Sequence, residues 1–156
     1  MASAGEAKAS PRVPVFLDAS VIVAASRSVY GGSARVLRVC ASNRFRGLVS
    51  EAVLLEARMS IVRKFDDPDL VRYYKQIALL EPEIVARPDP ELLKACAAIT
   101  SPKDARVLAA AIAGKAAYLL TLDRRHLLSP KVAAAGLSVK IMTPGDFLQV
   151  AVDGRG

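Results

Sequence analysis

The sequence predicts an α/β fold, a three-layer α/β/α sandwich built around a central, mainly parallel sheet of four to five strands. Short apolar runs alternate with segments of helical periodicity along the chain, which is the element order of such folds. No internal repeat and no long linker interrupts the 156 residues, so we expect a single domain large enough to bury a core. We place this domain at residues 13–150, between a disordered N-terminal tail at 1–12 and a C-terminal tail at 151–156.

The first half of the chain is expected to supply two strands and four helices. We expect strands at 13–17 and 47–49, and helices at 21–27, 34–42, 51–65 and 67–80. Ser50 precedes the third of these helices in the N-cap position, and Leu55, Met59 and Val62 recur along it at the spacing of one buried face. Asp67 is expected to cap the fourth helix, because a proline follows it at the first helical position.

The second half continues the alternation. We expect strands at 83–86, 118–121 and 139–143, and helices at 91–99, 101–113, 131–135 and 144–150. Gly114 is placed to end the second of these helices, since helices often close on a glycine in the left-handed conformation. The strand at 118–121 is short and apolar, as a buried strand would be.

Composition limits the class of protein and its partners. The formal net charge is +7 and the isoelectric point is about 9.7, which favours a polyanionic partner such as nucleic acid or an acidic protein. No apolar run approaches the roughly 18 residues of a membrane span, and the N-terminus lacks a signal peptide, so we expect no membrane association and a cytoplasmic protein. Cys40 and Cys96 lie in apolar helical stretches and are expected to be buried thiols in a reducing compartment.

Three acidic residues are predicted to converge at one edge of the sheet. Asp18 follows the first strand directly, Asp123 lies just beyond the strand that precedes it, and Asp104 lies in the first turn of its helix. Parallel strands present their carboxyl ends on one side, where open α/β sheets bind ligands. Each acid also has an ordinary explanation. Asp18 can cap the following helix unless Ser20 does so. Asp104 can favour a helix dipole, and Asp123 can belong to a turn.

A cation is the expected partner of such a cluster. Converging carboxylates repel one another unless a cation neutralises them, and oxygen ligands suit Mg²⁺ or Mn²⁺. Glu56, at the border of the apolar face of its helix, is the candidate fourth ligand, although an isolated helical glutamate is usually solvated. A site of this kind lowers the pKa of a bound water and holds a phosphodiester for in-line attack.

Four segments of the sequence resemble the PIN-domain nucleases, in particular the VapC-type PIN proteins of bacterial and archaeal toxin–antitoxin systems. They are VFLDASVIVAA (15–25), LVSEAVLLEAR (48–58), SPKDARVLAAAIAGKAAYLLTLDRR (101–125) and VKIMTPGDFL (139–148). The third is the most specific, because an acid that opens an alanine-rich helix, followed by a strand and Thr-x-Asp, is distinctive of the family. The resemblance spans nearly the whole chain after the tail and implies a PIN-like fold.

The resemblance implies a role for each matching residue. The residues that would hold the metal and be catalytic are Asp18, Glu56, Asp104 and Asp123, with Asp18 and Asp104 the firmest ligands. Ser20 and Thr121 would hydrogen-bond the carboxylates or the water. Glu51 is the alternative to Glu56, which is preferred because the acid of the family follows the serine, here Ser50, by about six residues.

Basic residues stand where many relatives carry a further acid after the last aspartate. This chain has Arg124, Arg125 and His126 there. The two arginines, with Lys103 and Arg106, would form an electrostatic track for RNA around the acids, or would be solvated surface charges. His126, the only histidine, has no partners for a zinc site, and a metal-activated water needs no histidine base. We expect it to be a surface or helix-packing residue.

By this resemblance the protein is expected to be a Mg²⁺- or Mn²⁺-dependent endoribonuclease that cleaves single-stranded or structured RNA with a metal-activated water. It would be the toxin of a toxin–antitoxin pair, with an antitoxin protein as partner, and would form a homodimer through the helix from Asp67 to Leu80. The alternative is a catalytically weak PIN domain that binds RNA or protein. A phosphatase of the haloacid-dehalogenase type fits less well, since it needs a second aspartate two positions after Asp18, where this chain has Ser20.

Overall fold

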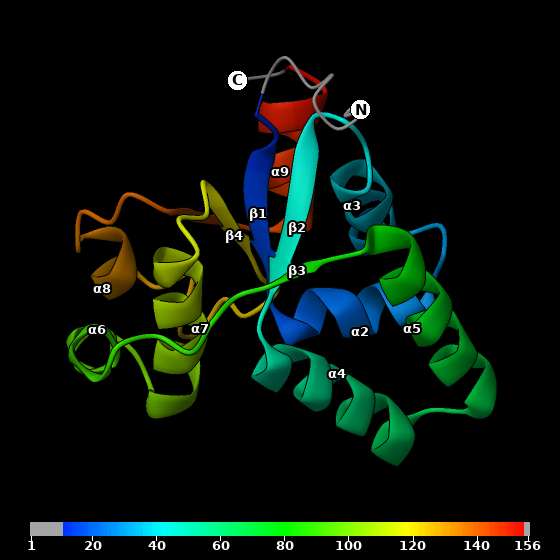
Figure 1. The fold of residues 1–156 in the computed structure, drawn as a ribbon, viewed down its shortest axis with the longest axis horizontal. Helices are drawn as coiled ribbons and strands as arrows, with labels where there is room; N and C mark the ends of the chain where they lie inside the picture. The colour runs from blue at the N-terminus through cyan, green and yellow to red at the C-terminus, as the bar shows by residue number, and fades with distance from the viewer. Residues whose placement is uncertain (1–10, 155–156) are drawn as a thin grey trace, which may run out of the picture.

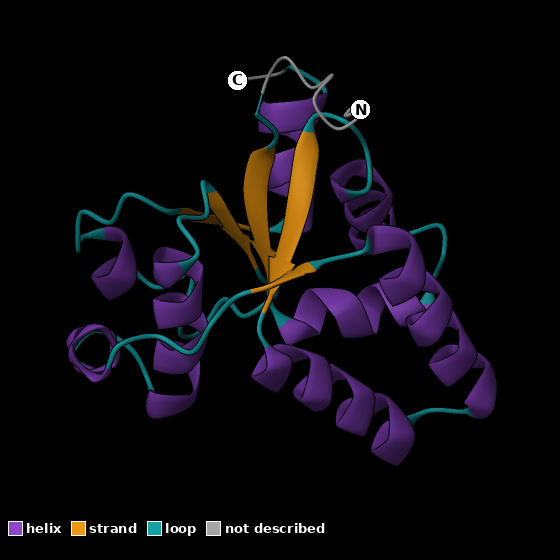
Figure 2. Cartoon of the chain, viewed as in Figure 1, coloured by secondary structure: helices purple, strands orange, loops and turns teal. Residues whose placement is uncertain are grey.

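A five-stranded parallel sheet lies at the centre of the fold and carries helices on both faces (Figures 1 and 2). The computed structural model describes residues 11–154, so residues 1–10 of the expected N-terminal tail lie outside it. The strands are β1 (Val13–Leu17), β2 (Phe45–Val49), β3 (Glu83–Ile84), β4 (Tyr118–Leu120) and β5 (Lys140–Met142). Every neighbouring pair is parallel, which confirms the predicted three-layer α/β fold.

The strand order β3-β2-β1-β4-β5 determines where a ligand can bind. The chain builds the sheet outward from β1 to β3 and then returns to the other side of β1 to add β4 and β5. The order therefore reverses between β1 and β4. In open parallel sheets, ligands bind outside the carboxyl ends of the strands at such a switch point.

Helices occupy nearly all the connections between strands. They are α2 (Ala19–Arg27), α3 (Gly32–Cys40), α4 (Glu51–Lys64), α5 (Asp67–Leu80), α6 (Pro90–Ala97), α7 (Pro102–Ala113), α8 (Pro130–Ala133), α9 (Pro144–Phe147) and a π-helical turn (Leu148–Val152). Figure 1 shows α2, α3 and α5 gathered on one side of the sheet, and α6 and α7 on the other. The last turn extends two residues past the expected end of the domain at residue 150. None of the described helices is long and apolar enough to span a membrane.

The core lies between the sheet and these helices. Phe16, Leu17, Leu119 and Leu120 are fully buried, as expected for central strands covered on both faces. Phe147 closes one end of the core, where its ring packs edge-on against Phe45 and Tyr118 at centroid distances of 5.3 and 5.1 Å. Cys40 and Cys96 are buried free thiols, as predicted.

The predicted buried face of α4 is wrong. Val53, Ala57 and Ile61 are the buried residues of this helix, whereas the predicted positions are exposed by 56% at Leu55 and 56% at Val62. Both sets are apolar and recur at helical spacing, so the helix carries two candidate faces. The packing of α4 against α2 determines which of the two faces is buried. Sequence periodicity alone does not predict that packing.

Several helix ends also differ from expectation. Asp66, one residue before Asp67, occupies the N-cap position of α5. Gly114 does follow α7, but with φ −79°, and it is Lys115 that adopts the left-handed conformation at φ 57°. A glycine is needed at position 114 for space, because an added Cβ would lie 2.9 Å from a methyl carbon of Val85.

Candidate metal centre

Asp18 and Asp123 lie at the switch point, because they follow the carboxyl ends of β1 and β4. The two strands pair in register up to Leu17 and Leu120, and the backbone N–H of Asp18 donates to the carbonyl oxygen of Leu120 at 3.0 Å. The residues that follow each strand, Asp18 on one side and Thr121 on the other, therefore lie side by side. Sequence reasoning predicted this convergence from the strand ends alone.

Three hydrogen bonds fix the buried carboxylate of Asp18. Oδ2 accepts from the hydroxyls of Thr121 at 2.7 Å and Ser20 at 2.8 Å, and Oδ1 accepts from the backbone N–H of Ala19 at 2.8 Å. Asp18 is thus the N-cap of α2, and the alternative that Ser20 takes this role is wrong. A carboxylate has about four lone-pair sites, so three donors leave capacity for one more partner.

The same two hydroxyls anchor the loop after β4. The oxygen of Ser20 accepts from the backbone N–H of Leu122 at 3.1 Å, and that of Thr121 accepts from the backbone N–H of Asp123 at 3.0 Å. Each hydroxyl therefore donates to the carboxylate of Asp18 and accepts from the loop that carries Asp123. The two aspartates are positioned relative to one another by these side chains.

Asp104 approaches the site from the first turn of α7 and is only 6% exposed. Its Oδ2 accepts from the hydroxyl of Ser101, the N-cap residue, at 2.8 Å. Burial raises the pKa of the Asp104 carboxyl, the hydrogen bond from Ser101 lowers it, and the negative charge of Asp123 raises it; the net shift is upward. A bound cation would offset both the burial of Asp104 and the negative charge of Asp123.

The pKa of the Asp123 carboxyl is shifted in the opposite direction, downward. Burial acts to raise the pKa of its carboxyl, but hydrogen bonds from the backbone N–H groups of His126 and Arg125 outweigh burial, and the pKa is lowered. These N–H groups lie 3.1 and 3.0 Å from Oδ1. Of the pair, Asp123 ionises first and Asp104 holds its proton longer.

His126 is exposed, as expected of a surface residue, and it also lies against the acidic cluster. Its Nδ1 lies 3.2 Å from Oδ2 of Asp104 and 3.4 Å from Oδ2 of Asp123. One ligand atom from each of these three residues can be chosen so that all lie within 4.8 Å of one another. The available sequence signal was the i, i+3 spacing of His126 from Asp123 in a turn, but the contact with Asp104 is visible only in the fold.

Glu56 lines one cavity together with the three aspartates, while the closely spaced cluster consists of Asp104, Asp123 and His126. A hollow of about 460 Å³ is lined by Asp18, Glu56, Asp104 and Asp123, together with Ser20, Lys64 and Lys103. Glu56 reaches it from α4, and its Oε2 lies 3.0 Å from the ammonium group of Lys103. Glu51 faces a neighbouring pocket and is absent from the lining of this cavity, so the geometry favours Glu56 as the site acid.

The four predicted basic residues have different positions. Lys103 lines the acidic cavity, and its hydrogen bond with Glu56 raises the pKa of its ammonium group. Arg106 lines the neighbouring pocket instead. Arg124 and Arg125 are exposed in the loop beyond Asp123 and line neither hollow.

Comparison with known proteins agrees with this geometry. A family model described as a PIN domain matches residues 14–125, which contain all four acids. The chain belongs to the PIN-domain family. In fold, this PIN domain is similar to the crystal structure of VapBC2 from Rickettsia felis bound to a DNA fragment from its promoter, with a TM-score of 0.62 and 16% identity over 83% of this chain and 98% of that one. No curated protein matches the sequence.

The donor atoms of this PIN domain fit a divalent metal ion. PIN domains are generally nucleases that use such ions. Asp104 and Asp123 supply two carboxylate oxygens within reach of one ion, and Asp18 and Glu56 supply two more on the same cavity. Carboxylate oxygens are the ligands that Mg²⁺ and Mn²⁺ prefer. His126 adds a nitrogen that Mn²⁺ accepts more readily than Mg²⁺ does.

Proposed function

We propose that this PIN domain is a Mg²⁺- or Mn²⁺-dependent endoribonuclease that cleaves single-stranded or structured RNA. One observation carries the proposal: four carboxylates line a single cavity at the switch point of a parallel sheet, from the residue after β1, from α4, from α7 and from the loop after β4. Carboxylates arranged in this way repel one another and are costly to bury unless a cation is present. A bound divalent ion would lower the pKa of a water and stabilise the charge that develops on a phosphodiester.

The residues of the chain have separate tasks in this proposal. Asp18, Glu56, Asp104 and Asp123 bind the ion. Ser20 and Thr121 hold the carboxylate of Asp18 in one orientation, so that the site is already arranged before substrate arrives. Exposed cations around the acids attract the phosphates of RNA, and Lys103 is the one that lines the acidic cavity itself.

We further propose that the nuclease is the toxin of a toxin–antitoxin pair and pairs with an antitoxin protein. The resemblance of four sequence segments to VapC-type proteins and the fold similarity to VapBC2 support this assignment. We also propose a homodimer in the cytoplasm. An apolar helix with exposed side chains, α5, is the candidate contact.

Cleavage of a labelled single-stranded RNA tests the activity. The wild type should cut the RNA with Mn²⁺ or Mg²⁺ and not with EDTA, and Asp18→Asn, Asp104→Asn and Asp123→Asn should each be inactive. Asp67→Asn, an exposed acid on α5, is the matched control and should be fully active. RNA binding without metal-dependent cutting would instead identify a catalytically weak PIN domain that acts as a binding module.

A further inference from the structure

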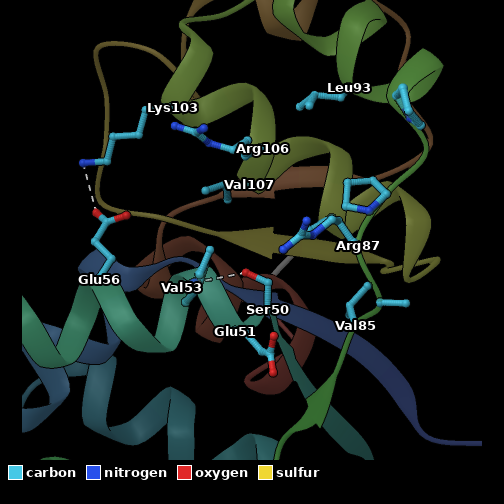
Figure 3. Close-up of a pocket in the computed structure, with 15 residues that line it drawn as sticks. Ser50, Glu51, Val53, Glu56, Val85, Arg87, Leu93, Lys103, Arg106 and Val107 are labelled. Atoms are coloured by element: carbon cyan, nitrogen blue, oxygen red, sulfur yellow. Dashed lines mark hydrogen bonds and ion pairs between the residues drawn. The ribbon is translucent and has the colours of Figure 1, made fainter.

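A second, larger pocket lies beside the acidic cavity (Figure 3). It has a volume of about 630 Å³, within the range of about 300–1,000 Å³ that small-molecule sites occupy. Its walls come from the start of α4, the segment that follows β3, α6 and α7. Neither the family fold nor the four acids require this pocket, and its lining differs in character from that of the acidic cavity.

The lining combines an apolar surface with unpaired cations. Val53, Val85, Leu93 and Val107 supply apolar side chains from four different elements. Arg87 comes from the segment after β3 and Arg106 from α7, and Figure 3 shows both side chains at the pocket. Within residues 11–154, neither guanidinium takes part in an ion pair, so both are available to an anionic ligand.

The two hollows meet at the ion pair of Glu56 and Lys103. Both residues line the acidic cavity, and both also line the second pocket. Figure 3 shows this pair at one side of the pocket, with the carboxylate of Glu56 joined to the ammonium group of Lys103. The two hollows are therefore adjacent and share this pair as part of their walls.

We propose that this second pocket is a nucleotide-binding subsite, which takes the nucleotide adjacent to the cleaved phosphodiester. The apolar side chains contact the face of the base, and the guanidinium groups of Arg87 and Arg106 bind phosphate or lie over the base. None of the described residues that line the pocket is aromatic, so base recognition depends on aliphatic contacts and guanidinium planes. The proposal rests on the ribonuclease function proposed above.

The pocket is lined by three basic and two acidic side chains, so its charge favours an anionic ligand. The planar fork of an arginine recognises a phosphate, and two of the three basic side chains are arginines. The pocket is also continuous with the site where the cleaved phosphate would lie. An extended nucleotide chain would occupy both hollows at once.

Binding of a fluorescein-labelled single-stranded RNA of eight nucleotides, measured by anisotropy in EDTA, tests the subsite without any cleavage. Arg87→Ala and Arg106→Ala should each raise Kd about three- to tenfold. Each should also reduce the slope of log Kd against log salt by about 0.7, the value expected for one lost phosphate contact on a single strand. Lys131→Ala, which removes an exposed cation on α8 that lines neither hollow, is the matched control and should change neither quantity appreciably.

Methyl NMR locates the bound nucleotide independently. With the same RNA, the methyl signals of Val85, Leu93 and Val107 should shift, and those of Val71 on α5 should not. Equal effects of the arginine and lysine variants, or methyl shifts absent from the pocket, would overturn the subsite. If the RNA binds as expected but the wild type never cuts it with Mn²⁺, the nuclease proposal fails, and the pocket is an RNA-binding site with no cleaved bond beside it. If only an acidic peptide shifts these methyl signals, the pocket is a protein-binding site and the inference is wrong.

Discussion

Replacement of Asp104 by asparagine should stabilise the metal-free protein while abolishing cleavage. Oxygen atoms of Asp104 and Asp123 lie no more than 4.8 Å apart. Two unit charges at 4.8 Å repel by about 1 kcal/mol in bulk water and by about 3 kcal/mol at an effective dielectric constant of 20. Asparagine has nearly the same shape and can still accept the hydrogen bond from Ser101, so most of this repulsion is removed at little other cost.

We therefore expect the asparagine variant to gain about 1–2 kcal/mol of unfolding free energy at pH 8 in EDTA, or about 2–8 °C in Tm. Folding raises the pKa of Asp104, so its ionised form destabilises the folded state. This penalty is fully present above the folded-state pKa and vanishes below the pKa of the unfolded chain, about 3.9. The difference in Tm between variant and wild type should shrink as the pH falls towards 4.

Melting temperatures in EDTA and in excess Mn²⁺ measure this directly. Mn²⁺ should reverse the order, because the wild type binds the ion better and mass action stabilises it more. Asp67→Asn is the control, since that acid is exposed in the first turn of α5, where it favours the helix dipole, and its loss should leave Tm unchanged or lower. Two results would contradict this reasoning: a Tm of Asp104→Asn below that of the wild type in EDTA at pH 8, or a Tm difference that grows as the pH falls. In either case, repulsion between the acids would not determine the difference in stability.

Three further predictions concern the hydrogen bonds that support the site, the proposed homodimer and the buried thiols. Thr121→Val removes the buried hydroxyl that joins the carboxylate after β1 to the loop after β4, and should cost about 1–3 kcal/mol and most of the activity. The control Thr100→Val should cost less than about 1 kcal/mol, because that hydroxyl has no hydrogen-bond partner within residues 11–154; equal losses would argue against a role for the linkage. Sedimentation should find a dimer at micromolar concentration and a monomer for Val71→Glu, which places a charge on the exposed side of α5; a monomeric wild type would end the dimer proposal. Burial raises the pKa of Cys40 to about 12 and also raises that of Cys96, so a disulfide reagent at pH 8 should modify these thiols only after unfolding, and rapid labelling of the native protein would contradict the fold.

Local signals explain which parts of the fold were predictable. The strand at Val13–Leu17 matches the prediction residue for residue, because an apolar run directly precedes an acid. A serine cap followed by a proline marks the start of the helix Pro102–Ala113, and a glycine marks its end. Each of these signals lies within a residue or two of the helix end that it marks. The convergence of Asp18 and Asp123 also followed from a general rule, since parallel strands end at the same edge.

Features that depend on contacts between distant segments were missed. Leu55 and Val62 are as apolar as the residues that α4 buries, and only its packing against α2 decides which set faces inward. His126 joins the acids through Asp104, which lies in another element. The pocket that contains Arg87 and Arg106 requires four elements to be placed in space. No local pattern in the sequence encodes any of these three arrangements.

The hydrogen bond from Thr121 to Asp18 spans 103 positions in the chain, which has a consequence for synthesis on the ribosome. The first two acids, at positions 18 and 56, emerge well before the last, at position 123. At about 5–20 residues per second, the interval between residues 56 and 123 is roughly 3–13 s. During that interval the nascent chain lacks β4, the neighbour of β1 that carries both the threonine and the last aspartate. The acidic site is therefore incomplete on the nascent chain until residue 123 has been added.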